Sequence, residues 1–294
     1  MKGRPYREED LPGLMAAMAA WIAAAGRCAY DHVGELAHRI HQIHRIHQIH
    51  QIHRSPPAGE PVQVWEDASG LAGVTISGRF GNAFDVFAAP RVRGGEAEER
   101  MIEAAAEATA RGTREPYLLT DVFDCERTRM EVLERLGFAR FRVWDHVNER
   151  PLAEPVAEPV VPGGFTVRAA TAADAGGLDA AHAAAFGEGW TFRADSPGRP
   201  SVVQAPDGRI AAFAVAWTDP VNRAGHFEPV GTHPAFQRRG LARAAMLHAM
   251  RGMREAGMET VTVNHDAENR PAARLYRSLG FAVTHETYGY RRPR

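Results

Sequence analysis

The chain has 294 residues, of which 45% are hydrophobic and 24% charged, and its formal net charge is −1. This length and composition fit two ordinary globular domains, and the balanced charge disfavours nucleic acid or an anionic membrane as a partner. The two cysteines, Cys28 and Cys125, match no metal-ligand spacing. We therefore expect neither a disulfide framework nor a metal site, and a location in the reducing cytoplasm.

The longest apolar run covers residues 11–25 and contains Pro12 and Gly13. It is too short to span a bilayer, and the acidic residues 8–10 before it do not resemble the positive start of a signal peptide. The run instead predicts an amphipathic helix that begins near Asp10.

Residues 38–54 form a repeat in which isoleucine recurs at every third position from 40 to 52 and histidine directly follows each isoleucine. A period of three matches neither a fixed stripe on an α-helix nor the alternation of a strand. A polyhistidine metal or pH-sensing site is one reading. We favour an expanded repeat that lengthens a loop or helix, because no cysteine or carboxylate joins the histidines within the tract.

Four prolines fall in residues 151–162, a composition typical of a semi-extended linker. The chain therefore divides into residues 1–150, the linker 151–162 and residues 163–294. The flanks resemble each other, since Arg4 and Asp10 correspond to Arg168 and Asp174 at an offset of 164, and residues 136–138 repeat as 279–281 at an offset of 143. This pattern predicts a tandem repeat, with about 20 extra residues in the first copy.

The second copy alternates strands and helices. We predict strands at 165–169, 201–204, 210–217, 224–232, 258–264 and 283–291, and helices at 171–185, 241–256 and 270–279. This order corresponds to an α/β fold whose mixed sheet is covered by helices on both faces. Pro229 lies inside a predicted strand and marks an edge or a bulge there.

A basic turn links the strand 224–232 to the next helix, with the sequence Gln237-Arg238-Arg239-Gly240-Leu241-Ala242. The N–H groups at the start of a helix, together with a glycine that follows two arginines, favour phosphate binding. The alternative is a pair of solvated surface arginines.

This turn resembles the pyrophosphate loop of the GNAT (GCN5-related N-acetyltransferase) superfamily. A second segment, with Asn264, Asn269, Ala273, Tyr276 and Gly280, resembles another motif of that family. The resemblance covers residues 165–294 well, whereas residues 2–148 resemble the family only as a degenerate copy. The resemblance implies two tandem GNAT-like domains and acetyl-CoA as the acyl donor.

The resemblance also implies the roles of single residues. The strand residues Val230, Gly231 and Thr232 would pair with the pantetheine arm of acetyl-CoA, and Asn269 would contact the cofactor unless it serves only as a helix cap. Tyr276 would protonate the departing thiolate unless it is only a core residue.

The base is less specified by the motifs. Glu228 is the first candidate and His226 the reserve, although a water chain can also deprotonate an amine. Aromatic residues could line an acceptor pocket, although lone aromatics more often belong to the core; they are Trp190, Phe192, Trp217 and Tyr288.

The first copy departs from the motifs. Residues 91–96 carry Glu96 where a small residue is expected, Leu133 stands in the place of Tyr276, and Glu126 in that of Asn269. We expect this copy to keep the fold and to bind acetyl-CoA poorly or not at all.

The sequence thus predicts an N-acetyltransferase that acetylates a primary amine of a small molecule, as a monomer or a homodimer. Alternatives are an enzyme like mycothiol synthase, also a tandem GNAT protein, and a non-catalytic acyl-CoA sensor or scaffold.

Overall fold

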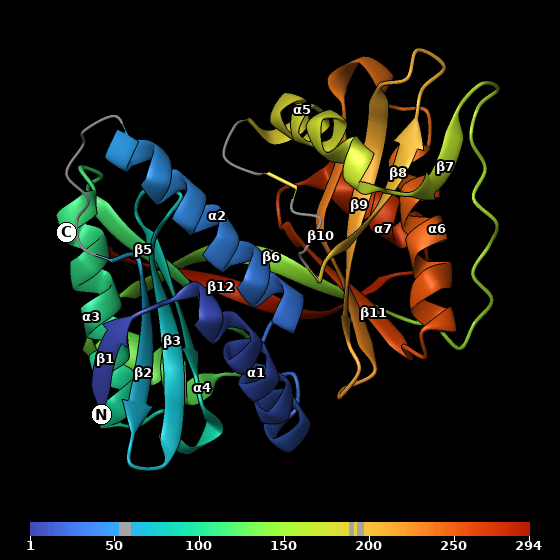
Figure 1. Cartoon of the computed structure of the whole chain (residues 1–294). Helices are drawn as coiled ribbons and strands as arrows, with labels where there is room; N and C mark the ends of the chain where they lie inside the picture. Colours follow the sequence, from blue (N-terminus) through green and yellow to red (C-terminus); the bar gives the residue numbers. More distant parts are fainter. Residues whose placement is uncertain (53–59, 188–190, 193–196) are drawn as a thin grey trace. The chain divides into compact units, whose positions relative to one another are not determined.

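The computed structural model describes residues 1–52, 60–187, 191–192 and 197–294, and for residues 44–52 it describes the backbone alone. The chain forms two compact units that are discontinuous in sequence (Figure 1). Unit 1 consists of Met1–Asp31, Leu36–His146 and His285–Arg294, and unit 2 of His32–Glu35 and Val147–Thr284. The residues 285–294, predicted within the second domain, therefore pack with unit 1.

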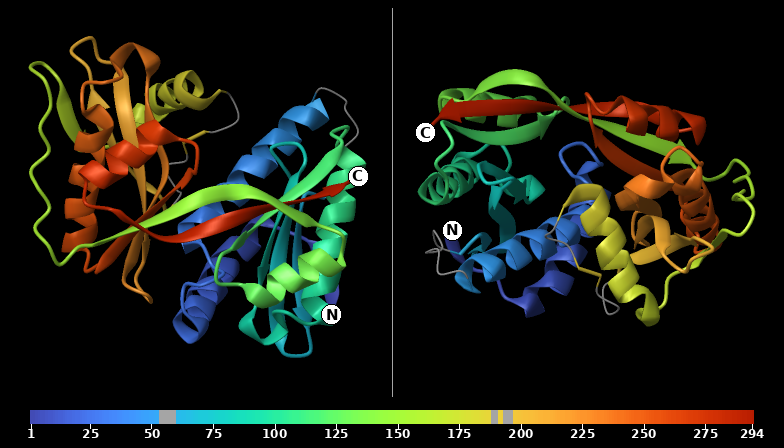
Figure 2. Two further views of the ribbon diagram at one scale, coloured as in Figure 1. Left: turned by 180° about the vertical axis from the view of Figure 1, so that it is seen from behind. Right: turned by 90° about the horizontal axis from the view of Figure 1, so that it is seen from above.

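Unit 1 contains a mixed sheet in the order β1-β2-β3-β4-β5-β12-β6, in which β4 and β5 run parallel, whereas β1-β2, β2-β3, β3-β4 and β5-β12 are antiparallel pairs. The strand β12 (Ala282–Pro293) pairs antiparallel with β5 and lies alongside β6 (Figure 2). The other elements are β1 (Lys2–Pro5), η1 (Glu8–Asp10), α1 (Leu11–Ala25), most of α2 (Val33–Ile52), β2 (Val62–Asp67), β3 (Gly70–Arg79), β4 (Ala83–Ala88), η2 (Pro90–Val92), α3 (Glu96–Gly112), β5 (Tyr117–Phe123), α4 (Arg127–Arg135) and the first part of β6 (Ala139–Pro151).

Unit 2 continues the order with β11-β10-β9-β8-β7, beside the last residues of β6. Its elements are β7 (Thr166–Ala169), η3 (Ala172–Asp174), α5 (Ala175–Phe186), β8 (Arg199–Gln204), β9 (Ile210–Asp219), β10 (Ala224–Thr232), η4 (Pro234–Phe236), α6 (Leu241–Glu255), β11 (Thr260–Asp266) and α7 (Arg270–Ser278). The predicted strands and helices of this half are confirmed to within a few residues.

Both faces of the unit 2 sheet are covered. Successive residues of β9 point to opposite faces, so Ala212 and Ala214 join the core under α6 whereas Phe213 contacts Phe186 and His182 of α5. The helix α6 contributes an almost continuous apolar face, with Leu247 and Met250 fully enclosed. The mixed α/β fold expected from the sequence is confirmed.

The internal repeat is visible as repeated hydrogen bonding. Arg4 holds the Asp10 carboxylate through two N–O contacts of 2.7 and 2.8 Å, and Arg168 holds Asp174 with the same two distances. Gly137 and Gly280 have φ angles of 81° and 82°, as expected of left-handed helix ends. The backbone N–H after each glycine donates to the carbonyl of Leu133 or Tyr276, which confirms that these two positions correspond.

The extra residues of the first copy form a helix. The repeat beginning at His38 continues α2 to Ile52, and Ile40 and Ile43 are buried in unit 1. Burial of these early isoleucines supports the reading of the repeat as lengthened structure. Residues 53 and 54 lie outside the described part of the chain.

The expectation of two unlinked cysteines is wrong. Cys28, which follows α1, and Cys125, which precedes α4, form a disulfide within unit 1 with a Cα–Cα distance of 6.1 Å. They are separated by 97 residues, so their proximity depends on tertiary folding and leaves no signal in local sequence. The cytoplasmic location stays a prediction.

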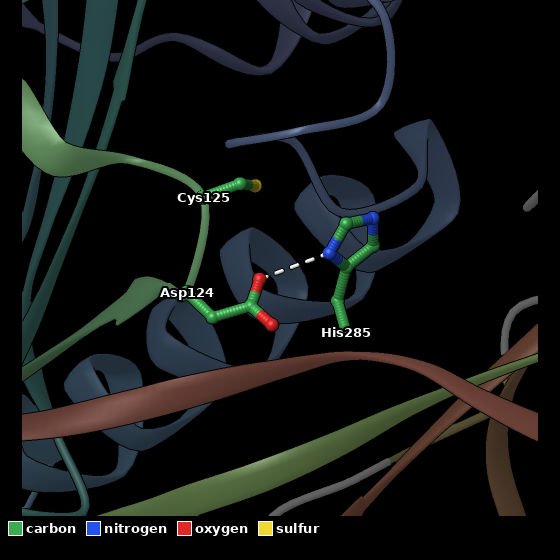
Figure 3. A group of neighbouring side chains, drawn as sticks. All are labelled: Asp124, Cys125 and His285. Carbon is green, nitrogen blue, oxygen red and sulfur yellow. Dashed lines mark hydrogen bonds and ion pairs between the residues drawn. The ribbon is translucent and has the colours of Figure 1, made fainter.

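Cys125 has polar neighbours, and Figure 3 shows it with Asp124 and His285. Nδ1 of His285 lies 2.9 Å from Oδ1 of Asp124. One oxygen, sulfur or nitrogen atom from each of these three side chains lies within 4.8 Å of the other two, which is close enough to share a metal ion. Because the Cys125 sulfur is bonded to Cys28, it is not available as a thiolate ligand in this structure.

Candidate active site

The strand β10 separates from β11 in the middle of unit 2. The two strands pair in parallel from Ala224 with Thr260 to Phe227 with Val263. On its other side β10 stays paired with β9 as far as Thr232, with a shift of register between Phe227 and Val230. The bulge predicted from Pro229 is therefore confirmed.

Pairing ends on one side of β10 only, so its residues beyond Phe227 can offer backbone groups to a ligand. Gly231 is needed at this point, because a Cβ there would lie 2.5 Å from a ring atom of Phe213 and 2.9 Å from one of Phe186. A residue with a side chain at this position would therefore displace the Phe213 or Phe186 ring.

A cavity of about 780 Å³ lies in unit 2 where the split strand, the basic turn and α7 meet. This volume is within the range of small-molecule and cofactor sites. Its walls include all of the predicted site residues except Arg239, namely Glu228, Val230, Gly231, Thr232, Gln237, Arg238, Gly240, Leu241, Ala242, Asn269 and Tyr276. Predicted site residues from Glu228 to Tyr276, which lie far apart in sequence, thus line one cavity.

The basic turn has the backbone of an anion site. Arg238 and Gly240 have φ angles of 63° and 75°, and Gly240 forms the N-cap of α6 without a side-chain cap. The first N–H groups of a helix have no acceptor within the helix. The N–H groups of Leu241 and Ala242, both on the cavity wall, can therefore donate to an anion, supported by the helix dipole.

Arg239 lies elsewhere. Its guanidinium carbon is 5.9 Å from the ring centroid of Phe236, and the residue is not among those that line the cavity. Two arginines that the motif did not single out, Arg243 and Arg274, line it instead. Arg243 lies one position after the motif, and Arg274 lies between Asn269 and Tyr276, so only the folded geometry shows that both line the cavity.

Tyr276 is almost completely enclosed, with 6% of its surface exposed. Its ring packs between His265 and Phe281, at centroid distances of 5.6 and 6.0 Å. Burial, followed by the nearby negative charge of Glu228, raises the pKa of the Tyr276 phenol. The phenol therefore keeps its proton throughout the neutral range, as a proton donor must.

Glu228 lies on the cavity wall at the bulge. Its backbone carbonyl accepts a hydrogen bond of 2.7 Å from the indole nitrogen of Trp217 on β9. This bond fixes the strand where regular pairing is interrupted. Trp217 thus supports the site from the core and does not line the cavity.

The remaining predicted residues have mixed outcomes. Asn269 caps α7, since its Oδ1 accepts from the N–H of Ala272 at 3.1 Å, and it also lines the cavity. Its Nδ2 group is thus the part suited to a ligand contact. Tyr288 belongs to unit 1, where Arg140 stacks on its ring. Phe192 is half-buried and is not on the cavity wall, and Trp190 lies outside the described residues.

The corresponding turn of unit 1 is closed by the protein's own carboxylates. The N–H of Gly94, whose φ angle of 72° resembles that of Gly240, donates to Oε2 of Glu98 at 2.5 Å. Arg129 holds the other oxygen of this fully buried carboxylate, with contacts of 2.6 and 2.8 Å. Arg93 is paired with Glu126 at 2.9 Å.

Glu98 and Glu126 thus occupy the donors that phosphate would need in this unit, and burial raises the pKa of Glu126. The nearby cavity of unit 1 has a volume of about 30 Å³, room for about one water molecule. Glu96, suspected from the sequence, is exposed at its side chain, whereas Glu98 makes the contact. The sequence therefore indicated the correct turn, but the carboxylate that binds its N–H group is Glu98 and not Glu96.

Residues 178–281 match the model of the Acetyltransferase (GNAT) family. None of the helices among the described residues meets the length and hydropathy needed for a membrane span.

Similar proteins support this assignment. Proteins named mycothiol acetyltransferase from Nocardia farcinica and Thermomonospora curvata are each 33% identical, over 180 and 165 residues. The matches cover 54% and 49% of this chain and 59% and 53% of those relatives, so the chain spans little more than half of their length.

Two solved structures share the fold over nearly the entire chain. A GCN5-related N-acetyltransferase from Sphaerobacter thermophilus gives a TM-score of 0.60 at 20% identity and covers 99% of this chain and 95% of its own. A tandem GNAT protein from the clavulanic acid biosynthesis pathway gives 0.63 at 13% identity and covers 99% and 98%. At these identities the likeness concerns the fold alone, which is that of two GNAT-like repeats.

Proposed function

We propose that the protein is an acetyl-CoA-dependent N-acetyltransferase with one active site, in unit 2, which acetylates a primary amine of a small molecule. The observation that carries the proposal is the single cavity in which the split strand, the uncapped start of α6, Glu228 and Tyr276 meet. An anion-binding turn, a strand with free pairing capacity, a base and an acid are what direct acetyl transfer from a thioester to an amine requires.

The residues divide the work by position. The N–H groups of Leu241 and Ala242, with Arg238, hold the pyrophosphate, and the backbone of 230–232 pairs with the pantetheine amides. One N–H of this strand faces the thioester oxygen and stabilises its negative charge in the tetrahedral intermediate.

Glu228 takes a proton from the acceptor's ammonium group, and the neutral nitrogen forms a bond to the carbonyl carbon. The carbon–sulfur bond then breaks, and the Tyr276 phenol donates its proton to the thiolate, while the second proton on the nitrogen is released to water and a proton from water restores the phenol. Tyr276 is suited to this step because burial preserves its proton. No metal takes part in this scheme.

The proposal is tested by incubating the full chain with acetyl-CoA and a broad panel of primary amines, with release of free thiol as the readout. Turnover with at least one amine supports it. Saturable binding of acetyl-CoA without turnover on any amine favours an acyl-CoA sensor instead.

A second candidate acceptor is a thiol-carrying aminosugar, as expected of an enzyme like mycothiol synthase. The similarity to proteins named mycothiol acetyltransferase favours this candidate. Including a cysteinyl aminosugar in the panel, together with simple amines of equal size, decides between this acceptor and others.

Replacing Glu228 by glutamine should lower kcat/KM for the amine about 100-fold at pH 7, because the amide cannot accept the proton. Primary amines lose their proton in solution near pH 10. The remaining activity should therefore rise about tenfold per pH unit up to that range, whereas the wild type reaches a plateau once Glu228 is ionised. The measurement is kcat/KM from pH 6 to 10.

Glu158→Gln is the matched control, since this carboxylate of unit 2 is exposed and paired with Arg251. It should leave the profile unchanged. A loss of less than threefold in Glu228→Gln would assign the base role to a water chain.

The closed turn of unit 1 predicts one acetyl-CoA site per chain. Titration calorimetry of the full chain with acetyl-CoA should give a stoichiometry near one, because Glu98 and Glu126 already occupy the donors of the other turn. The full chain is required, since residues 285–294 complete the sheet of unit 1. Two equivalent sites per chain would contradict the prediction.

A further inference from the structure

The four residues His32–Glu35 come from the N-terminal half of the sequence and belong to unit 2. His32 is held by two bonds whose directions define its protonation state. Its Nδ1 accepts from the N–H of Gly34 at 2.9 Å, so its Nε2 carries the proton and donates to the carbonyl of Ala224 at 3.0 Å. The segment is thereby attached to the start of β10.

Gly34 brings the segment close to the sheet. A Cβ at this position would lie 2.2 Å from Cγ of Trp217, so no other residue fits without displacing the chain. Trp217 is the residue that donates to the Glu228 carbonyl. The next side chain, Glu35, is thus placed beside the strand that carries Glu228.

His226 lies between the two glutamates. One side-chain nitrogen or oxygen atom from each of Glu35, His226 and Glu228 lies within 4.8 Å of the other two. Nε2 of His226 is 3.4 Å from Oε2 of Glu35. His226 is 1% exposed, and its ring stacks on His32 at a centroid distance of 5.3 Å. Titratable side chains on both sides of it are thus His32, Glu35 and Glu228.

The hydroxyl of Thr262 determines which nitrogen of His226 carries a proton. This hydroxyl donates its only proton to the carbonyl of Gly225 at 3.2 Å, so it accepts from Nδ1–H of His226 at 2.9 Å. In the neutral ring Nε2 is therefore unprotonated and lies 3.4 Å from Oε2 of Glu35, with the Glu228 carboxylate also near the ring. Three acceptors converge, and a proton between them removes their mutual repulsion.

We propose that Glu35, His226 and Glu228 act as one proton-sharing unit, in which Glu35 is a positioning residue that prepares His226 to take the proton removed from the acceptor amine. The inference rests on the proposed function. The Glu228 carboxyl passes its proton to Nε2 of His226, which becomes an imidazolium paired with Glu35, and Glu228 returns to the carboxylate. The proton is later released to water, and no bond other than N–H and O–H changes in this step.

The test compares Glu35→Gln, Glu35→Asp and the control Glu158→Gln in the full chain. Glu35→Gln should lower kcat about tenfold to 100-fold at pH 7, with an unchanged KM for acetyl-CoA and a displaced acidic limb of the kcat profile. Glu35→Asp should restore part of the activity, and Glu158→Gln should match the wild type. An unchanged profile in Glu35→Gln would overturn the inference.

A second measurement does not depend on activity. Nitrogen-15 NMR of the histidine rings should show His226 protonated at Nδ1 when neutral, and the Nε2 signal should change in Glu35→Gln, because the carboxylate next to Nε2 is replaced by an amide. An Nε2–H tautomer or an unchanged Nε2 signal would overturn the inference even if no acceptor were found. Prior dialysis against EDTA should leave the His226 signals unchanged; a change would assign the cluster to a metal ion and overturn the proton-sharing role.

Discussion

Replacing Tyr276 by phenylalanine is expected to lower kcat about 100-fold while KM for acetyl-CoA stays within about twofold. The substitution removes one oxygen and keeps the ring between His265 and Phe281, so the cavity wall is preserved. What is lost is the proton for the departing thiolate, which matters in the transition state and not in the bound ground state. Steady-state kinetics with free thiol as the readout measure both parameters.

Tyr290→Phe is the matched control. Tyr290 is a tyrosine buried in the core of unit 1, with 2% of its surface exposed, and it lies in the unit with the closed turn. It should keep the wild-type kcat. If Tyr276→Phe also keeps it, water or another group protonates the thiolate, and the tyrosine has only a structural role.

Replacing Ala242 by glutamate should weaken acetyl-CoA binding at least about 100-fold, which corresponds to about 2.7 kcal/mol. Ala242 lies on the cavity wall in the first turn of α6, and this turn contains no acidic residue. A carboxylate there repels the pyrophosphate and competes with it for the N–H groups of the turn. Calorimetric titration measures the loss of affinity for acetyl-CoA, and repeating it at a second salt concentration measures how much of that loss is electrostatic.

Stability should not account for this loss. An acidic side chain in the first turn of a helix is favourable by about 0.3–1 kcal/mol, so the thermal midpoint should stay level or rise slightly. Ala242→Gln, equal in size and neutral, should weaken binding less than Ala242→Glu. Equal losses in both variants would mean that size and not charge is responsible.

The unit 1 turn already contains the natural counterpart of this experiment. Its helix α3 begins with three acidic residues in the first turn, and Glu98 folds back onto the Gly94 N–H. An internal carboxylate thus has the contact that a phosphate oxygen would have in unit 2. The two turns have a similar glycine conformation. In unit 1 the N–H of the turn binds the Glu98 carboxylate, whereas in unit 2 we propose that the turn binds a phosphate.

Local signals in the sequence were sufficient for much of the fold and the cavity. The strand-turn-helix at Gln237 to Ala242, the helix end at Gly280 and the proline at position 229 each depend on backbone rules that act within a few residues. For this reason the predicted strands, helices and bulge of unit 2 were confirmed, and all but one of the predicted site residues line the cavity.

Only the tertiary structure decided the features that join distant segments. The strand β12 completes the sheet of unit 1, Cys28 meets Cys125, and Glu35 reaches His226 across 191 positions of the sequence. Such contacts depend on long-range packing and strand pairing, for which residue spacing carries no period or motif. The sequence by itself therefore determined a mixed α/β fold and the turn proposed to bind phosphate, whereas folding determined which carboxylates and histidines surround the candidate base.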